Sequence, residues 1–193
     1  MRIVGGKWGG RILTAPKGSH TRPTADGQRE ALFNILEHGL GHSPQKVLDF
    51  FAGTGALGIE ALSRGAESIV FIENNLKTIE SIKKNCAALG ISDSHQVLIN
   101  APRLERSVDL LKKLPGAFLP FDTIFCDPPY GKGLIEKALT LLEAHANALF
   151  SSETVLVAET AKEEHPPQLP EAWHIIKDRE KGATRLLFYH RIG

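Results

Sequence analysis

The sequence has few of the features that mark secreted, membrane-spanning and metal-binding proteins. It contains only two cysteines, Cys86 and Cys126, and their apolar surroundings favour two buried thiols over a disulfide. The eight histidines show no CxxC, HxxxH or HExxH spacing, so we expect no metal site. No apolar run reaches the roughly 18 residues that span a bilayer, and the N-terminus lacks the apolar segment of a secretion signal. We therefore expect a cytoplasmic protein that binds no membrane.

The composition is that of one globular domain. The chain has 193 residues, of which 42% are hydrophobic and 23% charged, so we expect a single monomeric domain over residues 1–193. Its net charge is only +1, yet residues 1–30 carry six basic residues against two acidic ones. Such a basic segment indicates either contact with an anion, such as nucleic-acid phosphate, or a solvated loop.

Strand and helix patterns alternate along most of the chain. Apolar strands are predicted over residues 46–53, 68–73, 96–100, 121–126 and 154–160, and helices over 24–39, 56–65, 74–90, 103–114 and 133–146. This α/β alternation is typical of a parallel sheet with helices on both faces. Two predicted hairpins flank this region. An antiparallel hairpin is predicted near the C-terminus, at 173–179 and 184–190. A small hairpin is predicted at 2–4 and 11–16, within an N-terminal extension of residues 1–20.

A glycine-rich loop follows the first strand of this α/β pattern. Gly53, Gly55 and Gly58 have the GxGxxG spacing, which serves either ligand binding or a turn tight enough to pack a helix on a strand. Glu73 ends the second strand, where a carboxylate can accept hydrogen bonds from both hydroxyls of a ribose. Together these features fit a nucleoside-containing cofactor.

The charge beside the loop favours one cofactor. Asp49 precedes the first glycine, and a carboxylate there repels a pyrophosphate but suits a ligand with an ammonium and a sulfonium, as in S-adenosylmethionine. A carboxylate that only satisfies the turn is the alternative. Asn100 and Ala101 end the third strand, where the amide can either contact an adenine edge or form a turn.

The fourth strand ends in Asp127-Pro128-Pro129-Tyr130. Two prolines remove two backbone donors and fix two φ angles, so the corner is rigid. The exocyclic amine of a nucleobase is a poor nucleophile, because its lone pair is delocalised into the ring. The Asp127 carboxylate and the Pro128 carbonyl can accept hydrogen bonds from both N–H groups of the amine, so that its lone pair faces a methyl carbon. Tyr130 can stack on a flipped base. The motif therefore predicts methylation of a base amino group.

Four stretches, "RPTADGQREALFNIL", "VLDFFAGTGALGIEALSRGA", "FIENN" and "DPPYGKG", have the order and spacing found in one family. The chain resembles the RsmD family of bacterial 16S rRNA guanine-N2 methyltransferases from residue 1 to the C-terminal "RLLFYHR". The resemblance implies a Rossmann-like class I methyltransferase fold with a seven-stranded, mostly parallel sheet. It also implies S-adenosylmethionine as cofactor and, as substrate, guanine 966 of 16S rRNA in the small ribosomal subunit or an assembly intermediate.

The resemblance also assigns residues to the site. The expected catalytic residues are Asp127, Pro128, Pro129 and Tyr130. The expected cofactor pocket comprises Asp49, Phe51, Gly53, Gly55, Glu73, Asn74, Asn100, Ala101, Arg22, Thr24 and Arg29. We expect the tip of the N-terminal hairpin to contact rRNA through Lys7, Trp8 and Arg11, with Trp8 as a small core contact being the alternative.

Other functions remain open from the residues alone. A motif of this type also serves adenine-N6 methylation of DNA, although the chain has no extra domain for reading duplex sequence. The glycine loop is compatible with an NAD-dependent oxidoreductase, but that function leaves Asp49 and the motif at Asp127 unexplained. A non-catalytic RNA-binding protein is a further alternative.

Overall fold

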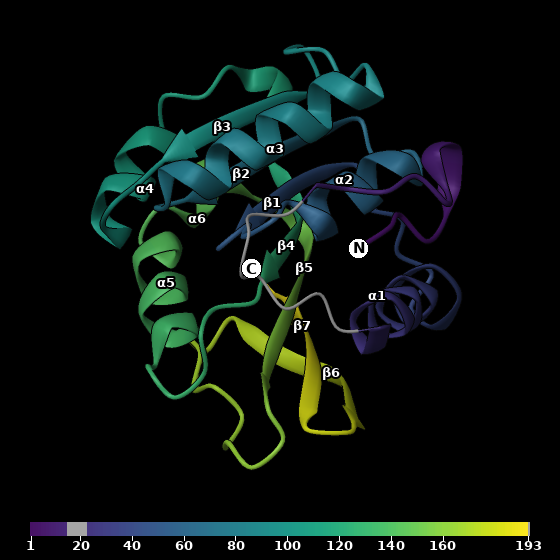
Figure 1. The fold of residues 1–193 in the computed structure, drawn as a ribbon. Coiled ribbons are helices and arrows are strands. Elements are labelled where there is room, and N and C mark those ends of the chain that lie inside the picture. Colours follow the sequence, from purple (N-terminus) through teal and green to yellow (C-terminus); the bar gives the residue numbers. More distant parts are fainter. Residues whose placement is uncertain (15–22, 193) are drawn as a thin grey trace.

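One seven-stranded sheet organises the part of the chain that this computed structural model describes, residues 1–14 and 23–192, without the side chains of 23–25 (Figure 1). The strand order is β3-β2-β1-β4-β5-β7-β6. The first five strands are parallel, and β7 pairs antiparallel with β5 and β6, which confirms the predicted sheet and its C-terminal hairpin. The strands are β1 (Lys46–Phe50), β2 (Ser68–Glu73), β3 (Gln96–Asn100), β4 (Phe121–Cys126), β5 (Phe150–Ala161), β6 (Trp173–Lys181) and β7 (Thr184–Arg191).

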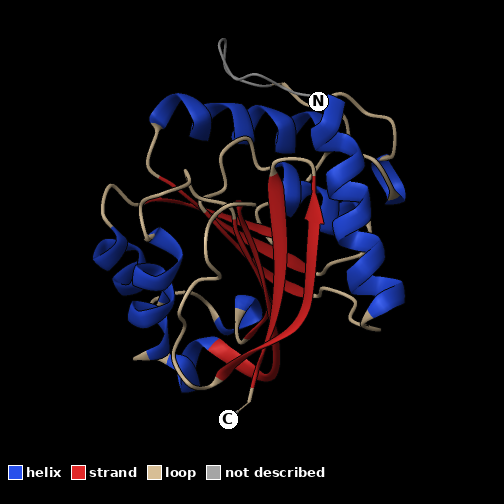
Figure 2. Ribbon diagram, turned by 90° about the horizontal axis from the view of Figure 1, so that it is seen from below, coloured by secondary structure: helices blue, strands red, loops and turns tan. Residues whose placement is uncertain are grey.

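Helices cover both faces of the sheet (Figure 2). One face packs against α1 (Pro23–Asn34), α2 (Ala56–Ser63) and α3 (Leu76–Leu89). The other face packs against α4 (Leu104–Leu111), α5 (Leu134–Glu143) and α6 (Ala146–Leu149). Three short turns of helix complete the described chain, namely η1 (Gly6–Trp8), η2 (Ile35–Gly39) and η3 (Gly116–Phe118).

The central strands are mostly apolar because both of their faces are buried. Val47 and Ile69 belong to the core cluster below α1, α2 and α3, whereas the next residues, Leu48 and Val70, belong to the cluster below α4 and α5. All four side chains are at most 1% exposed. Since successive strand residues point to opposite faces, each strand contributes to two cores at once.

The helix after β2 is defined by its two ends. The Asn75 side chain accepts hydrogen bonds from the backbone N–H groups of Lys77 and Thr78, at 2.9 and 3.3 Å, which satisfies donors that an α-helix leaves free at its start. Gly90 follows the helix with a φ of 70°, the left-handed conformation in which helices commonly end. The prediction over residues 74–90 is confirmed.

Some predicted boundaries were wrong. The helix predicted over 24–39 changes to a π-helical turn at Ile35, and the helix predicted over 133–146 divides into α5 and α6. Strand β5 begins at Phe150 rather than at Thr154, because Phe150 pairs with Phe121 before the register shifts. Thr154 lies beside that irregularity and donates a hydrogen bond from its hydroxyl to the Phe121 carbonyl at 2.8 Å.

The N-terminal arms pair, but they do not form regular strands within residues 1–14. Arg2 and Ile12 form one antiparallel bridge. Beside it, the Ile3 N–H donates to the Arg11 carbonyl and the Leu13 N–H to the Met1 carbonyl, each at 2.9 Å. The turn η1 lies at the tip, and residues 15 and 16 of the predicted second arm lie outside the described residues.

Gly58 lets α2 approach the sheet closely, and we expect Gly58→Ala to destabilise the protein. A Cβ at this position would lie 2.5 Å from the Phe71 ring and 2.9 Å from Ile69, both of which are fully buried. Overpacking of this kind costs about 1–3 kcal/mol, which exceeds the gain of up to about 1 kcal/mol in helix propensity. The free energy of unfolding measured in urea should fall.

Gly116→Ala is the matched control, because no atom lies within 4 Å of the added Cβ. Its stability should stay within about 0.5 kcal/mol of the wild type. If Gly58→Ala were equally neutral, close packing of α2 on β2 would not be the reason for glycine at this position.

Candidate active site

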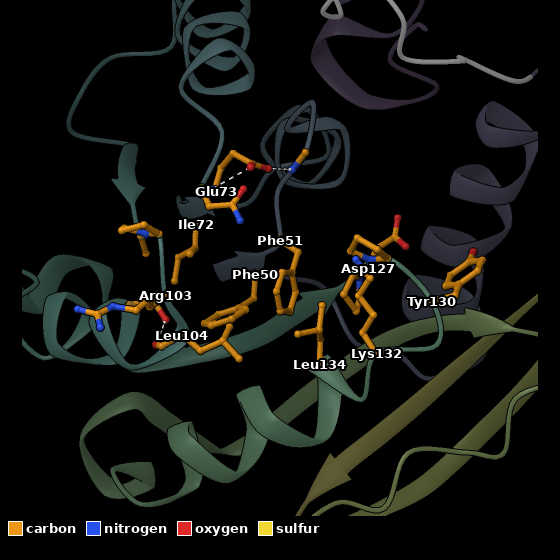
Figure 3. A pocket seen from close by; sticks show the side chains of 17 residues that line it. Phe50, Phe51, Ile72, Glu73, Arg103, Leu104, Asp127, Tyr130, Lys132 and Leu134 are labelled. Atoms are coloured by element: carbon orange, nitrogen blue, oxygen red, sulfur yellow. Dashed lines mark hydrogen bonds between the residues drawn. The ribbon is translucent and has the colours of Figure 1, made fainter.

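A cavity lies where the order of the sheet reverses. Strand β1 lies between β2 and β4, so the chain leaves the carboxyl ends of β1 and β4 at the point where ligands bind in open α/β sheets. The cavity has a volume of about 640 Å³ (Figure 3). Its lining includes nine of the predicted site residues, Phe51, Gly53, Glu73, Asn74, Ala101, Asp127, Pro128, Pro129 and Tyr130.

The glycine loop enters the cavity through an unusual backbone. Phe51, the first residue after β1, has a φ of 76°, a conformation that non-glycine residues rarely adopt. Gly53 and Gly55 have φ angles of 53° and 74°, and the Gly55 N–H closes a turn on the Ala52 carbonyl at 2.7 Å. Only Gly53 of the three motif glycines lines the cavity, so Gly55 and Gly58 serve the turn and the helix packing.

The Glu73 carboxylate holds the loop in position. One oxygen accepts a hydrogen bond from the Gly53 N–H at 2.9 Å, and the other accepts from the N–H groups of Asn74 and Asn75, both at 2.8 Å. Because each carboxylate oxygen has two lone pairs, one acceptor position remains, on the oxygen that Gly53 binds, and the side chain lines the cavity. This arrangement connects the end of β2 to the loop after β1 and presents one acceptor to a ligand.

Asp49 lies behind the loop and is absent from the cavity lining, although the sequence predicted it beside the ligand. Its carboxylate accepts a hydrogen bond from the Gly58 N–H at 3.0 Å and is 3% exposed. Burial raises the pKa of Asp49 to about 7, and the nearby charge of Glu73 adds to the effect. Asp49 can therefore act on a ligand through its charge and through the position of α2.

The motif after β4 forms the opposite wall of the cavity. Cys126 is fully buried at the end of the strand, and the four motif residues turn from there into the cavity lining. The Tyr130 hydroxyl donates a hydrogen bond to Glu159 on β5 at 2.7 Å, while its ring remains 41% exposed. In Figure 3, Tyr130 lies on the side of Asp127 that faces away from Phe50 and Phe51.

The Asp127 carboxyl group lies near two others, those of Asp49 and Glu159. Asp127 is open to the cavity, but the surrounding protein removes much of its solvation. This desolvation raises the pKa of Asp127 to about 8, and the charges of Glu159 and Asp49 contribute to the increase. Burial also raises the pKa of Glu159, although the hydrogen bonds from Tyr130 and Gln28 oppose this shift. Bound cations and N–H donors would favour the ionised forms.

Other predicted residues are not brought to the cavity wall. Asn100 is exposed at the end of β3, where it pairs with Glu73 in the sheet register, and it does not line the cavity. Arg29 is 5% exposed and binds Glu60, Asp26 and the Arg2 carbonyl. Arg22 and the side chain of Thr24 lie outside the described residues.

Sequence reasoning missed part of the lining. Pro102, Arg103 and Leu104 follow β3, so a search of every residue after a predicted strand end finds them. Lys132 lies between two glycines just after the Asp127 motif and is also found by that search. The remaining missed residues are Phe50, Ile72, Ser107 and Leu134, and their patterns do not distinguish them from core or helix positions.

The N-terminal segment lies against α2, outside the cavity lining. The buried Glu60 carboxylate accepts hydrogen bonds from the backbone N–H groups of Val4 and Gly5, both at 2.7 Å. Trp8 is half-buried against the core below α2, and the Lys7 ammonium lies 5.2 Å from its ring centroid. Lys7 and Arg11 are exposed, so both cations are accessible to an anion.

No helix within residues 1–14 and 23–192 has the length and hydropathy needed to cross a bilayer. In the same ranges, no three His, Cys, Asp or Glu side chains are grouped so that they could hold a metal ion.

The sheet order and the cavity define a methyltransferase with a class I fold, and comparisons with known proteins agree. The solved structure of the Escherichia coli protein yhhF superposes with a TM-score of 0.80 at 31% identity, covering 100% of this chain and 98% of that one. A ribosomal protein L11 methylase from Lactobacillus delbrueckii shares the fold with a TM-score of 0.65 at 18% identity, covering 95% of this chain and 86% of that one.

The chain belongs to the family described as Conserved hypothetical protein 95, whose model matches residues 1–190. It is 34% identical over 191 residues to ribosomal RNA small subunit methyltransferase D of Escherichia coli, covering 99% of this chain and 90% of that protein. The protein of the same name in Haemophilus influenzae is 35% identical over 189 residues, with coverages of 98% and 93%. The resemblance to the RsmD family is therefore confirmed.

We expect Asp49→Asn to change how stability depends on pH. Because the folded-state pKa of about 7 lies above the ordinary 3.8, the wild-type free energy of unfolding falls as pH rises between these two values. The variant has no carboxyl proton to lose at this position. Its stability relative to the wild type should therefore rise by a few kcal/mol across this window and stay constant at higher pH. Urea unfolding at about pH 4.5 and about pH 8 measures the difference.

Asp109→Asn on α4 provides the control, because this carboxylate is exposed. It should show no comparable change between the two pH values. An Asp49→Asn difference that is independent of pH would mean that Asp49 is not desolvated in the folded protein.

Proposed function

We propose that this protein transfers the methyl group of S-adenosylmethionine to the exocyclic N2 of a guanine in 16S rRNA, at position 966 by resemblance, in the small ribosomal subunit or an assembly intermediate. One observation carries the proposal. The glycine loop after β1 and the Asp127-Pro128-Pro129-Tyr130 motif after β4 line the same cavity. A site for a nucleoside cofactor and a grip for a planar amine are thereby adjacent.

The residues of the cavity fit S-adenosylmethionine. Its volume of about 640 Å³ is that of a small-molecule site, and Phe50, Phe51 and Ile72 provide apolar walls for an adenine ring. Glu73 offers its remaining acceptor position to a ribose hydroxyl. The carboxylates of Asp49 and Asp127 favour a cation and disfavour the pyrophosphate of NAD.

When bound, S-adenosylmethionine supplies an electrophilic methyl carbon on a sulfonium. Asp127 and the Pro128 carbonyl accept hydrogen bonds from the two N–H groups of the guanine amine, which orients the lone pair of the nitrogen toward that carbon. The proline ring of Pro129 keeps the corner rigid, and the exposed ring of Tyr130 stacks on the base. Positioning of this kind accounts for effective molarities of about 10⁵ M or more.

The Asp127 carboxylate also stabilises the transition state. Positive charge develops on the amine nitrogen as the new N–C bond forms, and a carboxylate held against that nitrogen lowers its energy. The carbon–sulfur bond of the sulfonium would break as the N–C bond forms, which leaves a neutral thioether, and the nitrogen would then lose one proton to Asp127 or to water. The preorganised charge of Asp127 therefore contributes to both binding and rate.

The direct test combines the protein with labelled S-adenosylmethionine and small subunits from a strain that lacks the endogenous enzyme. Mapping the labelled nucleotide identifies the base and the atom. Label on guanine N2 of 16S rRNA supports the proposal. Label on adenine N6, or no label with subunits while S-adenosylmethionine binds, contradicts it.

Asp127→Asn should lower kcat for methyl transfer by at least about 10²-fold, because the variant loses the negative charge that faces the developing cation. Binding of small subunits, measured by filter retention, should stay within about twofold. The exposed Asp93→Asn variant is the control and should keep full activity. Equal loss of binding and turnover in Asp127→Asn would indicate a structural role instead.

The exposed cations of the N-terminal segment are proposed to contact the rRNA backbone. Changing Lys7 and Arg11 together to Ala should weaken subunit binding. The negative slope of log K against log salt should become shallower by roughly 1–2, since about two phosphate contacts disappear. The control changes two exposed lysines after α4, Lys112 and Lys113, which lie at the other face of the sheet. An unchanged slope in the Lys7 and Arg11 variant removes the proposed contact.

A further inference from the structure

A second, smaller cavity shares a wall with the first. Its volume is about 200 Å³, and Pro128, Pro129 and Tyr130 line both cavities. On its far side lie Glu159 and Thr160, at the end of β5. The two cavities therefore adjoin along the motif, with Asp127 in the lining of the larger one and Glu159 in the lining of the smaller one.

The sheet register places Glu159 next to Asp127. Cys126, the last residue of β4, pairs with Ala158 of β5, so Asp127 leaves the sheet next to Glu159, and the two carboxylates are close enough for the Glu159 charge to act on Asp127. The Tyr130 hydroxyl donates to Glu159 at 2.7 Å and fixes one carboxylate oxygen. An acceptor just after β4 and an acceptor on β5 thus lie near each other at the motif.

The residue after Glu159, Thr160, also belongs to the lining of the smaller cavity. Its hydroxyl has no hydrogen-bond partner among the described residues, and Thr160 is only 2% exposed. The hydroxyl oxygen itself has less than 1 Å² of accessible surface, so it offers no contact to a ligand. The Glu159 carboxylate is therefore the polar group of this strand end that a ligand could contact.

We propose that Glu159 selects guanine by accepting a hydrogen bond from its N1–H, and this inference rests on the proposed function. In guanine the N1–H lies next to the N2 amine, so a base whose amine contacts Asp127 directs N1–H toward a neighbouring acceptor. Adenine and 2-aminopurine carry an unprotonated N1, which a carboxylate repels. Glu159 is thus a specificity-determining residue, and Tyr130 positions it.

Two other carboxylates, those of Glu136 and Glu164, line the smaller cavity, but they lie near the glycines that follow Tyr130. A Glu164 oxygen is 3.8 Å from the Cβ that a side chain at Gly131 would have, and a Glu136 oxygen is 3.7 Å from the equivalent point at Gly133. Both glycines follow Tyr130 in the chain, whereas Glu159 accepts a hydrogen bond from the Tyr130 hydroxyl itself. Burial and the mutual charges of Asp127 and Glu159 raise the pKa of Asp127, so a base that donates an N–H to each carboxylate relieves an existing repulsion.

The test compares two substrates that share the reacting amine. Small subunits are reconstituted with guanine or with 2-aminopurine at the nucleotide that the wild-type protein modifies, and kcat/KM is measured for both. The wild type should prefer guanine by at least about 100-fold, since a site built around an N–H donor rejects an analogue that lacks it. Glu159→Gln should lower this ratio at least about tenfold, because its amide N–H can donate to the N1 of 2-aminopurine.

Two further variants make the result specific. Glu164→Gln is the matched control in the same cavity and should keep the wild-type ratio. Tyr130→Phe keeps the ring but removes the hydroxyl that fixes Glu159, so it should lower the ratio as well, which tests the inference even if Glu159→Gln fails to fold. Calorimetry with S-adenosylmethionine confirms that each variant keeps its cofactor site.

The outcomes separate the inference from the proposed function. If the wild type methylates guanine N2 but the ratio is unchanged in folded Glu159→Gln, or is unchanged in Tyr130→Phe when Glu159→Gln does not fold, then Glu159 does not read N1–H and the inference is overturned. An equal loss of preference in Glu164→Gln overturns it too. If the wild type methylates no guanine in these subunits, the proposed function fails, and the inference fails with it.

Discussion

The parallel register between β1 and β4 is the constraint on which the site depends. Phe50 pairs with Cys126, so the two central strands end at the same level, and the glycine loop and the Asp127 motif leave the sheet side by side. Burial on both faces maintains this register. Leu48 and Ile124 pair within one core cluster and are fully buried, and a slip of one residue would exchange the side chains of the two faces. The position of the proposed catalytic residues is thus a consequence of core packing.

The site places several carboxylates where their ionised forms lower the stability of the folded protein. Asp49, Asp127 and Glu159 are each raised in pKa chiefly by burial, which means that their ionised forms are destabilised in the folded protein. Glu73, at the end of β2, accepts hydrogen bonds from three backbone N–H groups. A cationic cofactor and an amine-bearing base would supply further favourable partners to the other three carboxylates. Strain in the backbone is present at the same place, at Phe51.

The N-terminal segment shows how charge counted along a sequence differs from charge presented to a partner. Glu60 is fully buried and binds Arg29 and Arg64 as well as two backbone N–H groups of the segment. Arg29 is therefore part of the attachment to α2, and its cation faces inward. Lys7 and Arg11 remain exposed at the outside of the same segment. A buried ion pair of this kind would be costly to break on one side, because the other charge would be left unpaired.

Local patterns in the sequence determined the alternation of strands and helices and the two motifs that meet at the cavity. These features depend on neighbours within a few residues, such as the Asn75 cap of α3 or the two prolines after Asp127. Only the tertiary structure decided that Asp49 lies behind the loop, that Asn100 does not line the cavity, and that Arg29 is occupied by Glu60. It alone placed Glu159 beside Asp127, because that proximity arises from the pairing of β4 with β5, whose residues are far apart in the chain. Contacts between distant segments follow from the packing of the whole sheet, and no local pattern encodes them.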